Sequence, residues 1–286
     1  MLAVAFALLS AFGFGASNIF AKWGMRTASP ISATVISTFV NILVYWSILL
    51  GTGGIDSIPA KALVIFILAG LLSPALGRYF GFLGIARLGV TRAHPVIATM
   101  PIVTMLVAIA AFGEPARLPL VLGTLVCVGG VALLTAPREE GRRQRAAFLF
   151  PILSALTFGV SVNLRQLGLQ LYPHAMAGAA ITITSGMLCL VGVSLLRSHG
   201  RGLVGDRRSL LHFSGAGVFS LVAVYANFKS LQLGNIIVVT TLMNTAPLFS
   251  MVLSLLLLRD SEFITTRVVA ATCLIVLGAS LVTLFR

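Results

Sequence analysis

The two halves of this chain carry the same apolar pattern, and this duplication constrains the fold more than any single residue does. Leu9-Ser10-Ala11 recurs as Leu153-Ser154-Ala155, at an offset of 144 residues. Further along, Pro101 recurs as Pro247, so the offset drifts by only one or two residues. The sequence therefore predicts two related units and a short basic linker between them, with boundaries at 1–136, 137–145 and 146–286.

The composition indicates that both units lie in a membrane. Hydrophobic residues make up 58% of the chain and charged residues only 9%, whereas soluble domains carry about 25% charged residues. The net charge of +13 comes from arginines in short connections between apolar runs, where lipid headgroups explain them better than a nucleic acid does. The three cysteines lie inside apolar runs and are expected to be packing residues, not disulfides or metal ligands.

Ten apolar stretches are long enough to cross a bilayer, which takes about 20 residues per helix. Five stretches per unit is an odd number, so the second unit would enter the membrane from the opposite side. The sequence thus predicts an all-α integral membrane fold, with ten transmembrane helices arranged as two inverted five-helix repeats. The expected spans are 2–22, 31–50, 62–86, 93–112, 119–136, 147–168, 174–196, 210–231, 236–258 and 264–285.

Several short motifs recur in the same order in both units. The first unit contains Ala86–Leu88, Pro101, Gly113-Glu114 and the final run LGTLVCVGGVALL, with Gly123 and Gly130 seven residues apart. The second contains Ser230–Leu233, Pro247, Asp260 or Glu262, and the final run AATCLIVLGASLV. In these motifs the chain resembles the ten-helix EamA-like members of the drug/metabolite transporter superfamily, over nearly its whole length.

The resemblance implies transport, because family members move amino acids, nucleoside-type metabolites, drugs or sugar phosphates. The last helix of each unit also resembles the final helix of the small multidrug resistance proteins, which pairs two subunits. By that resemblance, spans five and ten are expected to pack against each other. One departure concerns the first helix, where the small multidrug resistance proteins rely on a carboxylate and this chain has none.

Two matched prolines indicate where a solute would bind. Carrier sites form where apolar segments are interrupted by Pro or Gly at corresponding positions of the two halves, as they are at Pro101 and Pro247. A proline within a span frees backbone carbonyls that another group must satisfy. Three candidate residues beside the prolines either line a ligand site or only satisfy those carbonyls: Thr99, Asn244 and Thr245.

Arg78 is the sharpest single candidate, because it lies within the third expected span and ionisable residues at membrane depth point to function. Its guanidinium could pair with a solute carboxylate or phosphate. The structural alternatives are extension to the headgroup level and a bond to carbonyls freed near Pro74. Other polar residues within the spans complete the candidate site: Tyr79, Ser17, Asn18, Ser161, Asn163, Tyr225 and Asn227.

No catalytic residue, metal site or cofactor is expected. All seven acidic residues lie outside the apolar centres, the four histidines are far apart, and no phosphate-binding loop is present. A cavity that holds Arg78 without a carboxylate suits an anionic or zwitterionic solute better than proton-coupled export of a cation.

The basic residues give two conflicting orientations. Fourteen fall at the odd-numbered connections, and five fall at the even-numbered connections or the C-terminus, among them Arg165 and Lys229. The positive-inside rule then places both termini outside, whereas similar ten-helix carriers commonly have both termini in the cytoplasm.

We therefore expect a secondary transporter, a metabolite or amino-acid exporter, that moves a small anionic or zwitterionic solute by alternating access across the bacterial inner membrane. The alternative is a membrane-embedded enzyme or lipid-handling protein that uses the same central cavity. The expected partners are a small-molecule solute and the lipid bilayer, with no nucleic acid, and the expected oligomeric state is a monomer or homodimer.

Overall fold

The computed structural model describes residues 2–53, 57–112, 118–135, 142–198, 206–233, 239, 242–243, 245–257 and 265–284, and the regular elements within them are all helices. Six helical segments of this part are long and apolar enough to cross a membrane: Leu2–Gly24, Pro30–Gly51, Ala60–Leu88, Arg145–Leu171, Ala175–Gly192 and Arg207–Leu233. The chain is an all-helical, multi-pass membrane protein. The total of ten spans stays a prediction.

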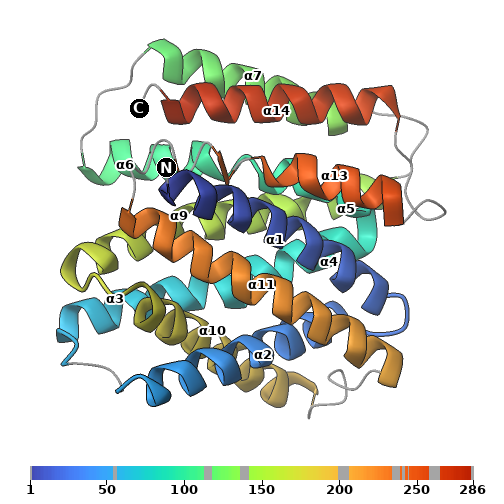
Figure 1. Cartoon of the computed structure of the whole chain (residues 1–286). Coiled ribbons are helices and arrows are strands. Elements are labelled where there is room, and N and C mark those ends of the chain that lie inside the picture. Colours follow the sequence, from blue (N-terminus) through green and yellow to red (C-terminus); the bar gives the residue numbers. More distant parts are fainter. Residues whose placement is uncertain are drawn as a thin grey trace.

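The helices follow the order expected from the apolar stretches (Figure 1). Those of the first half are α1 (Leu2–Gly24), α2 (Pro30–Gly51), α3 (Ala60–Gly70), the π-helix η1 (Leu71–Gly77), α4 (Arg78–Leu88), α5 (Val90–Ile97), α6 (Met100–Phe112) and α7 (Leu118–Thr135). Those of the second half are α8 (Arg142–Ala147), α9 (Leu149–Leu171), α10 (Ala175–Ser198), α11 (Arg207–Leu233), α13 (Ala246–Leu257) and α14 (Thr266–Leu284).

The fourth expected span, 93–112, is interrupted, as the proline within it indicated. The chain is helical from Val90 to Ile97, breaks, and is helical again from Met100. Pro101 explains the break, because its nitrogen carries no hydrogen to donate to the carbonyl of Ile97 four residues earlier. It is instead the second residue of α6, where a helix needs no such donor.

The first helix of one half packs antiparallel on a long helix of the other half. Ser10 and Ser17 lie on one face of α1, and their hydroxyls donate to the carbonyls of Ala223 and Ala216 of α11, both at 2.9 Å. Small side chains at such spacing let two membrane helices approach closely. The helices α1 and α11 therefore form one seam between the two halves, and they run alongside each other in Figure 1.

The second half repeats this seam with the roles exchanged. In α9, the hydroxyl of Ser154 donates to the carbonyl of Gly77 at 2.7 Å, and that of Ser161 donates to the carbonyl of Ala69 at 2.8 Å. Ser154 and Ser161 are the counterparts of Ser10 and Ser17, 144 residues later. The duplication seen in the sequence is thus also a duplication of contacts.

The π-helix η1 adds one residue to the first half between the two hydrogen bonds of this seam. The two acceptors in α11, Ala216 and Ala223, are seven residues apart, whereas their counterparts Ala69 and Gly77 are eight apart. The serine donors, in contrast, are seven residues apart in both seams. The first half therefore has one extra residue here, and it lies within the wide turns of Leu71–Gly77.

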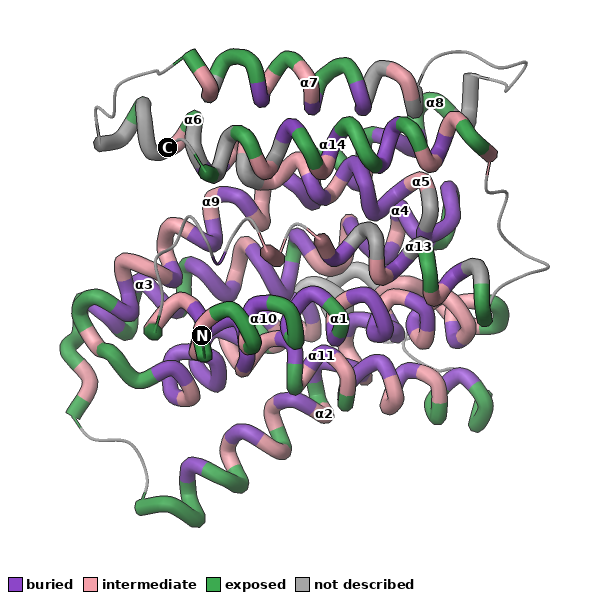
Figure 2. Tube along the Cα trace, turned by 45° about the horizontal axis from the view of Figure 1, so that its top comes forward, coloured by how far each residue is buried: buried purple, intermediate pink, exposed green. Residues whose placement is uncertain are grey.

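The fifth and tenth expected spans pack against each other, as the resemblance implied. In Figures 1 and 2, α7 and α14 lie side by side along one edge of the molecule. A Cβ added to Gly130 of α7 would lie 3.0 Å from the carbonyl oxygen of Ala271, and one added to Gly278 of α14 would lie 2.6 Å from that of Gly123. The seven-residue spacing in each final run thus lets the two backbones touch.

The outer faces of the helices are apolar. Leu125 and Val128 of α7 are 62% and 55% exposed, and Leu277 of α14 is 59% exposed. Figure 2 shows such exposed positions along the outside of this helix pair. Apolar residues on the outside are what a protein surrounded by lipid requires.

Candidate functional site

A central cavity lies between the two halves, with space of about 150 Å³ for water-sized molecules. Its lining comes from both repeats, largely as pairs of equivalent residues. These pairs include Phe14 with Phe158, Phe82 with Phe228, Ile97 with Met243, and Met100 with Ala246. A site at the interface of two repeats is the usual place for a carrier to bind its solute.

The two broken helices reach this cavity in the same way. The helices α6 and α13 begin at the equivalent residues Met100 and Ala246, and both residues line the cavity. Just before each start, the hydroxyl of Thr99 donates to the carbonyl of Val96 at 2.8 Å, and that of Thr245 donates to the carbonyl of Leu242 at 2.7 Å. Both threonine hydroxyls therefore bond to a carbonyl three residues earlier, and neither residue lines the cavity.

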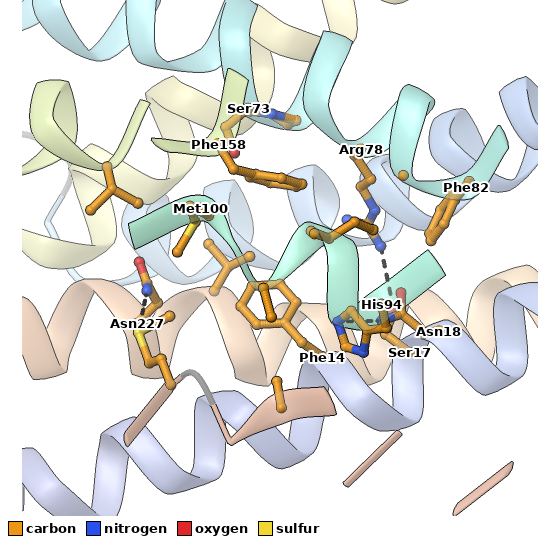
Figure 3. Close-up of a pocket in the computed structure, with 18 of the residues that line it drawn as sticks. Phe14, Ser17, Asn18, Ser73, Arg78, Phe82, His94, Met100, Phe158 and Asn227 are labelled. Atoms are coloured by element: carbon orange, nitrogen blue, oxygen red, sulfur yellow. Dashed lines mark hydrogen bonds between the residues drawn. The ribbon is translucent and has the colours of Figure 1, made fainter. Parts of the chain in front are cut away.

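Arg78 lies at one end of the cavity, as Figure 3 shows. Its Nη2 donates to Ser17 Oγ at 3.4 Å, and its guanidinium lies 5.2 Å from the centre of the Phe82 ring. Ser17 in turn donates to the backbone of α11, so this hydroxyl keeps capacity to accept. The groups around Arg78 are thus neutral.

His94 links three helices beside Arg78. Asn18 Nδ2 of α1 donates to His94 Nε2 at 3.1 Å, and His94 Nδ1 lies 2.5 Å from Ser250 Oγ of α13. His94 is only 8% exposed and lines the cavity together with Asn18. Since α1 and α5 belong to the first repeat and α13 to the second, His94 ties the two halves together at this end.

A second guanidinium, that of Arg165, also lines the cavity, and the sequence interpretation missed it. Arg165 was placed in a connection between spans, but it lies within α9 and is 7% exposed. Its Nη2 donates to Ser73 Oγ, its Nη1 donates to Asn227 Oδ1 at 3.5 Å, and its guanidinium lies 5.4 Å from the centre of the Phe228 ring. Its position inside the expected span 147–168 was the one available clue, the same clue that singled out Arg78.

No acidic side chain lines the cavity within the described part of the chain. The acidic residue that this part contains is Asp206, which lies outside the cavity at the start of α11. There its Oδ1 accepts from the Ser209 side chain and backbone and from Thr27 Oγ1, and these hydrogen bonds hold the pKa of the carboxyl below its usual value. The two cavity guanidiniums therefore share a neutral surface.

The other candidate residues lie in different places. Ser17, Asn18, Arg78 and Asn227 line the cavity. Outside its lining, Ser161 bonds to the α3 backbone, Asn163 Nδ2 donates to the carbonyls of Thr104 and Gly159, and the rings of Tyr79 and Tyr225 pack against Phe80 and Phe6. Pro101 and Pro247 are the second residues of α6 and α13, and Asn244 lies outside the described residues.

No group of three or more His, Cys, Asp or Glu side chains that could hold a metal ion occurs among the residues that the structure describes. Cys127 is buried in α7, where its Sγ donates to the carbonyl of Ile275 in α14 at 3.2 Å. It serves the helix pair, as a packing residue would.

Comparison with known proteins gives a family and a fold. The model of the EamA-like transporter family matches residues 1–136 and 145–284. Among solved structures, 29 chains match, and one of them, a crystal structure described only as that of a protein, has a TM-score of 0.69 and 17% sequence identity. That match covers 99% of this chain and 96% of the other, and at this identity it shows a shared fold. No curated protein matches the chain.

The family model matches nearly the whole chain, in two copies that coincide with the two halves. The protein therefore belongs to the EamA-like transporter family of the drug/metabolite transporter superfamily, a family of membrane transporters.

Proposed function

We propose that the protein is a secondary carrier that moves a small anionic or zwitterionic solute across the membrane by alternating access. The observation that carries this proposal is the central cavity between the two repeats, which holds Arg78 and no carboxylate among its described lining residues. The carrier would have ten spans, arranged as two inverted five-helix halves.

The contacts between the halves support the inversion. In both seams an antiparallel pair joins the first helix of one half to the third-span helix of the other, and α7 and α14 form a third antiparallel pair. Two similar halves of opposite orientation can exchange their conformations. Such an exchange closes the central cavity on one side of the membrane and opens it on the other.

The charge in the cavity supports an anionic group on the solute. A cation at membrane depth without a counter-charge is costly, and Arg78 has only neutral groups around it. A carboxylate or phosphate that enters from water would balance this charge and accept two parallel hydrogen bonds from the guanidinium. Arg78 would therefore hold the anionic group of the solute.

Transport into liposomes tests the proposal. Purified protein should move at least one labelled member of an amino-acid and organic-acid panel, and the solute should be recovered chemically unchanged. The Arg78→Ala variant should lower this transport by at least about tenfold, which corresponds to about 1.4 kcal/mol, and Arg78→Lys should retain part of it. Arg87→Ala is the matched control, because Arg87 is exposed and its guanidinium lies 4.3 Å from the Phe150 ring outside the cavity.

Two outcomes would contradict the proposal. A chemically altered solute would support the alternative of an enzyme or lipid-handling protein. Full transport of an anionic solute by Arg78→Ala would show that this guanidinium does not hold the cargo.

A further inference from the structure

Arg165 forms a second cationic end of the cavity, in addition to the end that Arg78 forms. We propose that the solute carries two anionic groups, one for each guanidinium, joined by an apolar middle, as in a dicarboxylate. This inference rests on the proposed carrier function and specifies the class of its solute.

Two buried polar atoms of residues that line the cavity lack a partner in the described protein. Arg165 Nε and Thr182 Oγ1 are both buried and make no hydrogen bond in the described protein, although both residues line the cavity. Thr182 is 1% exposed. A buried donor without an acceptor is unfavourable, and each oxygen of a carboxylate can accept such a hydrogen bond. The Arg165 end is therefore incomplete without an acceptor.

The two ends are built alike although their arginines are not repeat equivalents. Arg78 lies over Phe82 and Arg165 lies over Phe228, with guanidinium-to-ring distances of 5.2 and 5.4 Å. The two phenylalanines are equivalent positions, 146 residues apart. Each repeat thus supplies the same ring as a platform for a guanidinium, and the pseudo-symmetry places one guanidinium at each end.

An apolar section separates the two ends. Figure 3 shows Arg78 with Ser17 and Asn18 on one side of the view and Asn227 on the other, with Phe14 and Met100 between them. Arg165 bonds to Asn227 on that side and to Ser73, which Figure 3 labels between Asn227 and Arg78. A solute that reaches both ends must therefore pass aromatic and thioether side chains, which favour hydrocarbon in the middle.

Charge balance also favours two anionic groups over one. A monoanion would neutralise one guanidinium and leave the other without a counter-charge, since no described lining residue is acidic. A dianion neutralises both guanidiniums in the same cavity. The gain from the second group would be larger than in water, because the lining of the cavity is largely apolar.

The ligand-side test compares diacids with their half-esters on the wild-type chain. The probes are succinate, glutarate, adipate and suberate, each beside its monomethyl ester, which has nearly the same length and one charge fewer. Binding is measured as thermal stabilisation of the purified protein. At least one diacid should bind at least about tenfold more tightly than its ester. Equal binding of diacid and ester at every length, or no binding of any diacid, would overturn the two-ended site.

The protein-side test removes one cationic end. Arg165→Gln should lower the affinity for the diacid by a larger factor than the affinity for its monomethyl ester and so abolish the preference for the diacid, while Arg165→Lys should keep part of the preference. Arg87→Gln is the matched control and should keep all of it, because its guanidinium lies over a ring outside the cavity. A preference for the diacid that survives in Arg165→Gln would overturn the proposal. If Arg165→Gln does not fold, the comparison of diacid and ester on the wild type decides alone.

The two proposals fail in different ways. If the carrier assay succeeds with monoanions or zwitterions while no diacid binds better than its ester, only the two-ended site is wrong. If no member of the solute panel is transported, the carrier function itself is contradicted.

Discussion

Ser10 and Ser154 make the same hydrogen bond in opposite directions across the molecule. Ser10 of the first half donates to the backbone of Ala223 in the second, and Ser154 of the second half donates to the backbone of Gly77 in the first. Each bond joins a helix that opens a repeat to the long helix of the other repeat. The two halves are therefore held by reciprocal contacts.

These reciprocal bonds should contribute equally to stability. Ser10→Ala and Ser154→Ala should each lower the free energy of unfolding by about 0.5–1.5 kcal/mol, and the double variant should lose the sum because the sites share no partner. Chemical unfolding in lipid–detergent mixtures measures this. Ser47→Ala is the control, since Ser47 is exposed on α2, and a loss at Ser47 equal to that at Ser10 would contradict the role of the bond.

The contact between α7 and α14 should be intolerant of added side-chain atoms. Gly278→Ala should destabilise the protein by about 1–3 kcal/mol, because the new Cβ would lie 2.6 Å from two backbone atoms of α7. Gly130→Ala should do the same to a smaller degree, since its nearest neighbour is the side chain of Ile275 at 2.6 Å. Thermal unfolding of the purified protein ranks the variants.

Gly129 supplies the control for this prediction. It neighbours Gly130 in α7, but no atom lies within 4 Å of its added Cβ. Gly129→Ala should therefore leave stability unchanged or raise it slightly, because alanine is the better helix former by about 0.5–1 kcal/mol. Equal destabilisation by Gly129→Ala and Gly278→Ala would show that helix contact is not the cause.

His94 and Ser250 should behave as one unit. His94→Ala and Ser250→Ala both remove the hydrogen bond between α5 and α13, so the double variant should lose less stability than the sum of the single variants. The expected coupling is about 0.5–3 kcal/mol. A double-mutant cycle on the free energy of unfolding measures it, and a cycle between His94 and the distant Ser10 should give no coupling. Strict additivity of His94 and Ser250 would contradict the contact.

Asp206 should make the stability depend on pH in the acid range. Hydrogen bonds from Ser209 and Thr27 lower the pKa of its carboxyl in the folded state, so the ionised form stabilises the fold. This contribution is present above the unfolded pKa of about 3.9 and is lost as the pH falls through the lower folded pKa.

The Asp206→Asn variant checks this sign. It should unfold at a lower temperature than the wild type at neutral pH, because it accepts the Ser209 and Thr27 hydrogen bonds without the charge. The difference in unfolding temperature should shrink as the pH falls below about 4. A difference that is constant down to low pH would show that ionisation of Asp206 does not contribute.

Periodic features were predictable from the sequence. The glycine spacing and its resemblance to a pairing helix predicted the contact between α7 and α14, and the matched prolines predicted helix interruptions beside a cavity. Arg78 was predicted to be a candidate site residue because it is a lone charge in an apolar stretch, and it lines the cavity. These inferences need only the local sequence pattern and no knowledge of the tertiary contacts.

Tertiary contacts decided the rest. Arg165 follows Asn163 near the end of an apolar stretch, and only the longer course of α9, to Leu171, buries it against Ser73 and Asn227. Thr99 and Thr245 were equally good candidates for ligand contact until the structure placed their hydroxyls on carbonyls. A polar side chain in a membrane helix needs a hydrogen-bond partner, and the sequence alone does not show whether that partner is a backbone carbonyl, another side chain or a ligand.

The π-helix at Leu71–Gly77 lets the two halves differ in length by one residue. An extra residue in a regular α-helix turns everything after it by about 100°, which would swing Arg78 away from its place beside Ser17. Because the wider π-helical turns take up the extra residue, α4 keeps the same side chains directed toward the second half. The two halves can therefore differ in length at this point and still make the same reciprocal serine hydrogen bonds.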